Sequence, residues 1–328
     1  MSPQAVSAHG GAGRRWSLWS RLRLLLVGLL VALAALTLGF QVLDPFEYAV
    51  REDAEQFSAT VLERRDGRLR LRPGAVGTSL GPRVTLGAHG LRNPPVQEPK
   101  PAGRYRILVI GDSVPFGWGV DDEDAFPRQV ERALQALARP GRSIEVVNGA
   151  SPGWGLPEEL WWLEQEGLAF APDLVVHCVI ANDVEVPGPP RTFVLPDWAR
   201  GVRLFRLAEL AWGRMTGPPQ PPPPPGEMVA AMLPAVLGWF QARCTAAGAR
   251  YVLLDTLTVA ETEAMAERAQ IERIAVPCGQ DFIDRYHVAA GDAHPNRDGH
   301  ADMASRMLPR LVAILRDADP ALLVEPGR

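Results

Sequence analysis

The stretch Arg106–Gly119, RILVIGDSVPFGWG, decides how the fold is interpreted. A run of apolar, partly β-branched residues stops at Gly111-Asp112-Ser113, as a buried strand does when it reaches a turn. A serine at this position has two interpretations. Ser113 could cap a following helix, or it could be a nucleophile held where a strand meets a helix. The rest of the chain has to decide between them.

Strand-like and helix-like segments alternate downstream of this stretch. Short β-branched runs predict strands, and amphipathic segments predict helices. Such alternation is typical of a parallel sheet with helices on both faces. Strands are expected at Arg106–Ile110, Ser143–Asn148, Asp173–Ala181 and Arg250–Asp255, and helices at Ala125–Ala138, Leu156–Leu168, Glu227–Ala247 and Asp298–Arg316.

The composition is that of a folded protein, with 47% hydrophobic and 22% charged residues in 328. A net charge of -4 gives no reason to expect nucleic acid as a partner. Cys178, Cys244 and Cys278 are far apart and form no CxxC, so they predict neither a disulfide framework nor a zinc site. There is no HExxH motif and no phosphate-cradling glycine loop, so no metal or other cofactor is expected.

The N-terminal region contains a candidate transmembrane segment, Leu24–Leu43. Its 20 residues carry no charge, and this length suits a bilayer core. Arginines precede the segment and acidic residues follow it, so the positive-inside rule places residues 1–23 in the cytoplasm and the bulk of the chain outside. We expect an uncleaved single-pass anchor. A cleaved signal peptide is the alternative, but the apolar run is long for one and no small-x-small site follows it.

Composition also divides the rest of the chain. The segment 184–226 is rich in proline and ends in PPQPPPPP, a run that favours polyproline II and cannot join a sheet. We interpret it as an insertion, either a lid over a site or a solvated spacer. The expected organisation is a polar lead-in at 44–104 with a short strand near Val84–Asn93, an α/β domain at 105–316 that contains the insertion, and a C-terminal tail at 317–328.

Polar residues follow the expected strands, at the edge of the sheet where open α/β folds bind ligands. A serine hydroxyl becomes a nucleophile when a histidine takes its proton, and a carboxylate fixes the tautomer of that histidine. An oxyanion hole needs N–H donors beside them. The chain supplies Gly111-Asp112-Ser113, then Asn148 followed by GASPGWG, then Asn182-Asp183, and finally GDAHPN at Gly291–Asn296.

Together these four blocks resemble those of the SGNH/GDSL hydrolases over about Tyr105–Arg316, and the anchored layout resembles bacterial envelope members of that family. The resemblance implies a flavodoxin-like three-layer α/β/α fold with a parallel sheet and a serine esterase that needs no cofactor. It further implies a location in the bacterial inner membrane with a periplasmic catalytic domain. The roles implied are Ser113 as nucleophile, His294 as general base and then acid, Asp292 as its carboxylate, the Ser113 and Gly153 N–H groups and the Asn182 amide as oxyanion donors, and Asp112 and Asp183 as supporting residues.

Two positions depart from the family pattern. Ile180 stands where Gly-x-Asn-Asp has its glycine, and Gly291 stands where Asp-x-x-His has its aspartate. Asp292 is therefore one residue closer to His294 than the family pattern places it. A variant turn could still bring Asp292 to the imidazole. Otherwise a backbone carbonyl would orient His294 and the activity would be low.

Other residues near the expected site receive structural interpretations. His177 lies inside a strand and is expected to be a hydrogen-bonded core histidine, while His300 is expected to face the surroundings of the last helix. Core packing is favoured over stacking on a sugar ring for Trp118, Trp154, Trp161 and Trp162.

The expected function is a serine esterase acting on O-acyl esters, most simply O-acetyl esters, with cell-envelope glycans as plausible substrates. An O-acyltransferase with the same residues is the nearest alternative. It would resolve the acyl-enzyme with a sugar hydroxyl, and a membrane acyl-donor partner would favour it. A non-catalytic glycan-binding envelope protein is an alternative of another class, and a lysophospholipase is a weaker one.

Overall fold

The computed structural model describes residues 17–43, 48–65, 67–180, 183, 202–205, 207, 226–257, 263, 266–289 and 292–325. Most of the insertion expected at 184–226 lies outside this set, as do Asn182 and Gly291. Contacts divide the chain into two units. The first contains Met1–Tyr48 and Pro190–Pro218, and the second contains Ala49–Pro189 and Pro219–Arg328.

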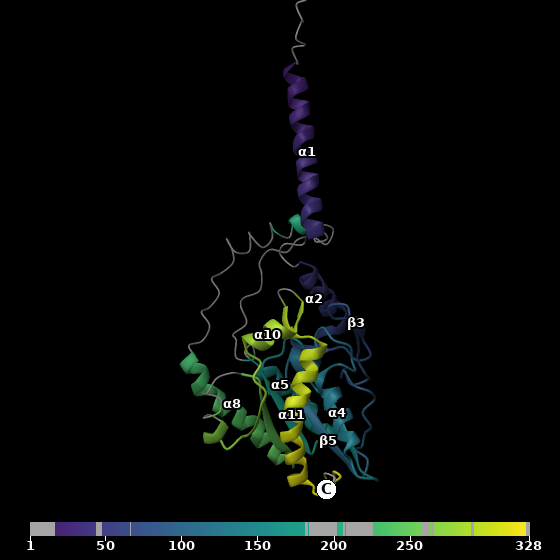
Figure 1. The fold of residues 1–328 in the computed structure, drawn as a ribbon, viewed down its shortest axis with the longest axis vertical. Helices are drawn as coiled ribbons and strands as arrows, with labels where there is room; N and C mark the ends of the chain where they lie inside the picture. The colour runs from purple at the N-terminus through teal and green to yellow at the C-terminus, as the bar shows by residue number, and fades with distance from the viewer. Residues whose placement is uncertain are drawn as a thin grey trace, which may run out of the picture. The chain divides into compact units, whose positions relative to one another are not determined.

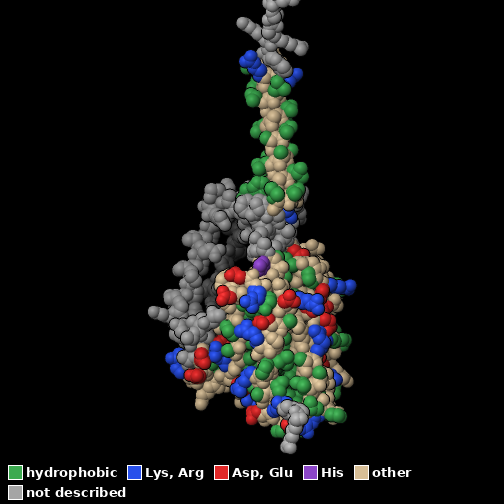
Figure 2. All heavy atoms as spheres, viewed as in Figure 1, with side chains coloured by type: hydrophobic (Ala, Val, Ile, Leu, Met, Phe, Trp, Pro, Cys, Tyr) green, Lys and Arg blue, Asp and Glu red, His purple; other side chains and the backbone are tan. Residues whose placement is uncertain are grey.

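The first unit contains helix α1 (Leu18–Leu43), which is long and apolar enough to cross a membrane. It begins before the span expected from Leu24 and ends at the same residue. None of the residues of this fully described helix is buried. Figure 2 shows hydrophobic side chains along its length and basic ones near its N-terminal end. The helix is compatible with a single-pass anchor or with a signal sequence.

The second unit is built on a five-stranded parallel sheet with the order β6-β5-β7-β8-β9. Numbered from its first strand, the sheet has the order 2-1-3-4-5 of flavodoxin-like folds. All four expected strands are present, and the fifth, β9, was not predicted because its sequence ERIA is short and half charged. The bounds are β5 (Arg104–Ile110), β6 (Ser143–Asn148), β7 (Leu174–Val179), β8 (Arg250–Asp255) and β9 (Glu272–Ala275).

Helices cover both faces of this sheet, as Figure 1 shows. Ile107 and Val109 of β5 face a core shared with α4 and α11, whereas Leu108 and Ile110 face a core shared with α5 and α8. The expected three-layer α/β/α architecture is therefore confirmed. The helices are α4 (Phe126–Ala136), α5 (Leu156–Gln165), the short η1 (Gly167–Phe170), α8 (Gly226–Ala246) and α11 (Arg297–Ala318).

The lead-in is more structured than its polar sequence suggested. Phe57 and Val61 form a small core with Val84, and this core continues into Phe116 and Trp118 of the loop after β5. The lead-in therefore packs directly against the turn that carries Ser113. Its elements are α2 (Tyr48–Val61), the hairpin β1 (Leu62–Arg65) and β2 (Arg68–Leu71), and the hairpin β3 (Val76–Thr78) and β4 (Arg83–Thr85).

A buried arginine at the end of the lead-in fixes the loop after β5. Arg92 is 2% exposed, donates to the carbonyls of Gly117 and Val120, the latter at 2.6 Å, and pairs with Asp122 at 2.6 Å. Burial lowers the pKa of the Arg92 guanidinium, and Asp122 opposes that effect. No local pattern predicted this role, because these three partners follow Arg92 by 25 residues or more.

Candidate active site

Ser113 is the first residue of α3 (Ser113–Phe116), a helix of four residues. Asp112 caps this turn, because its Oδ1 accepts from the Val114 N–H at 3.1 Å. Capping therefore does not account for Ser113. Gly111 has a φ of +149°, and a Cβ there would lie 2.8 Å from the Cys178 carbonyl oxygen, so the turn requires glycine. The helix that begins at the serine is a single turn, so this element can offer the oxyanion the backbone N–H of Ser113 but little helix dipole.

His294 reaches Ser113 from the other end of the domain sequence. Its Nε2 lies 2.7 Å from Ser113 Oγ. The hydroxyl also lies 3.1 Å from Asp112 Oδ2, so histidine is the closer of two acceptors. Ser113 is 6% exposed, and the His294 side chain is 29% exposed, which leaves the imidazole open to an incoming substrate.

Asp292 contacts His294 because both lie on one short strand, β11 (Asp292–Pro295), which pairs with β10 (His287–Ala289) after α10 (Gln280–Tyr286). Side chains two residues apart in a strand point to the same side. Asp292 Oδ1 accordingly hydrogen-bonds His294 Nδ1 and also accepts from the His294 backbone N–H at 3.0 Å. Asp292 does reach the imidazole, and it does so from a strand rather than from the variant turn that the sequence left open.

Trp118 holds the second oxygen of the same carboxylate. Its Nε1–H donates to Asp292 Oδ2 at 3.1 Å, and Phe57 of the lead-in packs edge-on against its ring at a centroid distance of 5.0 Å. The prediction that Trp118 belongs to the core is confirmed by its 6% exposure. Its hydrogen bond to Asp292 was missed, since 174 residues separate the two and no local pattern links them.

The electrostatics of Asp292 keep it ionised. Burial alone would raise the pKa of this carboxyl, but the hydrogen bonds and charge of His294, together with the Trp118 indole, outweigh burial and hold the pKa below its ordinary value. An ionised carboxylate at Nδ1 favours the tautomer that has its proton there. The unprotonated Nε2 then faces the serine hydroxyl.

The loop after β6 carries Gly153 and lies beside the serine turn, because the Ser151 N–H donates to the Gly111 carbonyl at 3.2 Å. Gly153 has a φ of +79°, in the region that favours glycine. Trp154 fixes the next position by donating from Nε1 to the Leu69 carbonyl of β2 at 2.9 Å. Asn182, the other expected oxyanion donor, lies outside the described residues.

Asp183 has a bracing role at the end of β7, where its Oδ2 accepts from the Ile180 N–H at 2.7 Å. Burial, then the charges of Glu159 and Asp112, raise the pKa of Asp183 well above its ordinary value. Glu159 in turn contacts His177 Nε2 at 2.7 Å. Burial lowers the pKa of His177 to about 3, so this histidine is the neutral, hydrogen-bonded core residue that the sequence predicted.

His300 is also a core residue. It is fully buried, stacks on Phe126 at a centroid distance of 6.1 Å and accepts from the Phe126 N–H at 3.3 Å. Among the described residues, no cluster of three or more histidine, cysteine or acidic side chains could hold a metal ion, and the three cysteines are free.

Comparison with known proteins places this geometry in context. The profile of the GDSL-like lipase/acylhydrolase family matches residues 109–301, more than half of the chain. Similar solved structures include TesA, with 19% identity, a TM-score of 0.43 and coverage of 64% of this chain and 99% of TesA. Another is the esterase EstA from Pseudoalteromonas sp., with 14% identity, a TM-score of 0.43 and coverage of 64% and 98%.

A family 3 carbohydrate esterase from Clostridium thermocellum has 14% identity and a TM-score of 0.43, with coverage of 65% of this chain and 98% of that enzyme. At such identities the likeness concerns the fold alone. No curated protein has a detectably similar sequence.

Proposed function

The chain belongs to the GDSL-like lipase/acylhydrolase family and is therefore an ester-hydrolysing serine hydrolase, and from this premise we propose Ser113 as its nucleophile, with His294 as general base and Asp292 as the carboxylate that orients it. One observation carries the proposal. Hydrogen bonds run without a break from Ser113 Oγ through His294, at 2.7 Å, to Asp292 and on to Trp118.

In the acylation step, Ser113 Oγ attacks the ester carbonyl and its proton moves to His294 Nε2. The backbone N–H groups of Ser113 and Gly153 and the side-chain amide of Asn182 stabilise the tetrahedral oxyanion in this proposal. His294 then gives the proton to the leaving alcohol, and the acyl group stays on the serine.

In the deacylation step, a water molecule enters from the exposed side of His294 and attacks the acyl carbonyl. Nε2 takes the water proton and returns it to Ser113 Oγ as the carboxylic acid leaves. Asp292 stabilises the imidazolium in both steps without itself accepting the proton. The lowered pKa of Asp292 suits that role, because the carboxylate stays charged throughout.

The substrate we propose is an O-acyl ester, with acetyl as the simplest acyl group, on a glycan of the bacterial cell envelope. The support is the location that α1 favours. As an uncleaved anchor it would leave Arg21 and Arg23 on the cytoplasmic side of the inner membrane and the hydrolase domain in the periplasm.

The test uses the full chain in detergent with p-nitrophenyl acetate, butyrate and octanoate. Ser113→Ala and His294→Ala should each lower kcat by about a thousandfold or more, as members of one catalytic unit do. Ser305→Ala and His287→Ala, which change the same residue types at exposed positions, should stay near wild type. Turnover by the Ser113→Ala variant would contradict the assignment of Ser113 as the nucleophile. A preference for the octanoate ester would contradict the proposal that the acyl group is acetyl.

The same assay separates the alternatives. Addition of a soluble oligosaccharide should not divert the acyl group if water is the natural acceptor. Acylated sugar as the main product would identify an O-acyltransferase. No turnover of any ester, combined with no labelling of Ser113 by a phosphonate probe, would leave only a non-catalytic glycan-binding role.

A further inference from the structure

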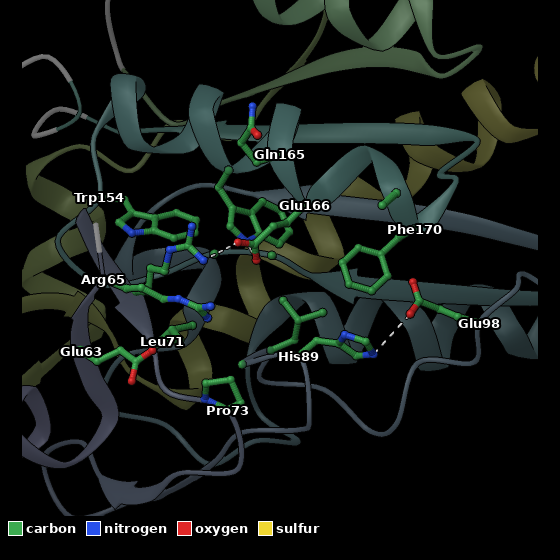
Figure 3. A pocket seen from close by; sticks show the side chains of 17 residues that line it. Glu63, Arg65, Leu71, Pro73, His89, Glu98, Trp154, Gln165, Glu166 and Phe170 are labelled. Carbon is green, nitrogen blue, oxygen red and sulfur yellow. Dashed lines mark hydrogen bonds and ion pairs between the residues drawn. The ribbon is translucent and has the colours of Figure 1, made fainter. Parts of the chain in front are cut away.

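A cavity of about 420 Å³ lies between the β1–β2 hairpin and the α5–η1 segment, and neither Ser113 nor His294 lines it. Its size is in the range of about 300–1,000 Å³ that small-molecule sites occupy. Figure 3 shows charged side chains and aromatic rings around it. Nothing in the hydrolytic mechanism uses this cavity.

The hairpin presents one face to the cavity. Glu63 pairs with Arg70 across the strands and Arg65 pairs with Arg68, so these four side chains share a face. The guanidinium group of Arg70 lies 4.4 Å from the centre of the Trp161 ring and forms an ion pair of 2.8 Å with Glu166. The ion pair holds the Arg70 guanidinium, a hydrogen-bond donor, and the Glu166 carboxylate, an acceptor, at the wall of the cavity.

The opposite wall repeats this arrangement. His89 Nε2 lies 3.4 Å from Glu98 Oε2, and the His89 ring meets the Phe170 ring edge-on at 5.4 Å. Leu71 and Leu91 line the space between the two polar pairs. A ligand here would meet donors and acceptors on two sides and apolar surface between them, as Figure 3 illustrates.

The charges of the lining limit the ligand class. The acidic lining residues are Glu63, Glu98 and Glu166, and the arginines are Arg65 and Arg70. With no excess of positive charge, the cavity does not favour a phosphate or a carboxylated ligand. An acyl chain would leave several charged groups desolvated. Vicinal hydroxyls fit, because they donate to the glutamates and accept from the arginine while the sugar ring covers the apolar surface.

We propose that this cavity binds an uncharged oligosaccharide segment, as an accessory subsite for the glycan that carries the ester. The link to the ester rests on the proposed function. Gly149, Ala150 and Trp154 line the cavity, and Gly153 is in the same loop. A glycan in the cavity would therefore contact the loop that carries the proposed oxyanion donor.

The test measures binding without catalysis. The full chain with Ser113→Ala, in detergent, is titrated calorimetrically with cellotetraose, xylotetraose, chitotetraose and, as an anionic comparison, tetragalacturonate. At least one neutral tetrasaccharide should bind. Glu166→Gln and Glu98→Gln should each weaken it about tenfold or more, since each removes a charged acceptor. The matched control is Glu164→Gln, which disrupts an ion pair of 2.6 Å with Arg243 outside the cavity and should bind like the parent.

The melting temperature of each variant is measured as a control for folding. A variant whose melting temperature equals that of its parent is folded. Three outcomes would each overturn the proposal. The first is that no neutral tetrasaccharide binds, and the second is that tetragalacturonate binds more tightly than the neutral sugars. The third is that the folded Glu166→Gln and Glu98→Gln variants bind as tightly as the parent protein. Ester turnover by the wild type is measured separately. Ester turnover without glycan binding would contradict only the proposed glycan subsite. Glycan binding without ester turnover would contradict the esterase proposal but would support the glycan subsite.

Discussion

Replacing Trp118 with phenylalanine should weaken catalysis while leaving the packing of the site in place. The change deletes the indole N–H that lies 3.1 Å from Asp292 Oδ2. An aromatic ring remains to pack against Phe57, whose centroid is 5.0 Å away. Neither Ser113 nor His294 is altered, so any loss of rate must act through Asp292.

The size of the effect follows from the burial of the carboxylate. The Asp292 side chain is 9% exposed, so water cannot fully replace the lost donor. A hydrogen bond to a charged group contributes about 1.5–3 kcal/mol. If the transition state depends on that bond, kcat/KM falls by about tenfold to a hundredfold. The pKa of Asp292 should rise toward its ordinary value, because one of the groups that lower it is gone.

The assay is p-nitrophenyl acetate hydrolysis by the full chain in detergent between pH 5 and 9, with Trp239→Phe as the control for loss of an exposed indole. A double-mutant cycle sharpens it. Because Trp118 acts through Asp292, Trp118→Phe should have little further effect once Asp292→Asn is present. A folded Trp118→Phe variant within twofold of wild type, or full additivity with Asp292→Asn, would refute the reasoning.

Three further predictions follow from the same contacts. Asp292→Asn should lower kcat by about a thousandfold or more, because an amide at Nδ1 favours the wrong tautomer; near-normal kcat would mean that another group orients His294. Gly153→Ala should lower kcat with little change in KM, since alanine is strained at a φ of +79° and moves the proposed oxyanion donor; an unchanged kcat would exclude that donor. Burial lowers the pKa of His300 from 6.5 to about 3, so the residue stays neutral in the native state. Below about pH 6 the unfolded chain binds a proton at His300 that the native state does not. The free energy of unfolding should therefore fall by about 1.4 kcal/mol for each pH unit on account of this residue. His300→Gln should flatten that slope in urea denaturation, and an identical slope would contradict the assignment.

Local patterns predicted the frame of the domain well. β6 and β8 begin and end at the expected residues because each is a short run in which at least half of the residues are apolar, with polar residues at both ends. β9 escaped prediction because its two charged residues give the segment no apolar alternation. The packed core of the lead-in was not predicted for another reason. Its small core forms only when Phe57 meets Phe116 and Trp118, and no local pattern reports a contact over such a separation.

The site divides in the same way. The motif blocks predicted that Ser113 and His294 would meet, and the structure brings their reactive atoms to 2.7 Å. The spacing of Asp292 counted against its role, because Asp292 is one residue closer to His294 than the family pattern places the aspartate. In a strand, the same spacing places both side chains on one side. The indole of Trp118 completes the carboxylate's partners from far away in the sequence.

The most direct test of the central claim is to locate the reactive serine. The full chain is treated with a p-nitrophenyl phosphonate, and the modified peptide is identified by mass spectrometry. The account predicts one adduct, on Ser113, which is absent in Ser113→Ala and forms much more slowly in His294→Ala. An adduct on another residue, or equal labelling of wild type and His294→Ala, would contradict the proposed pairing of Ser113 with His294.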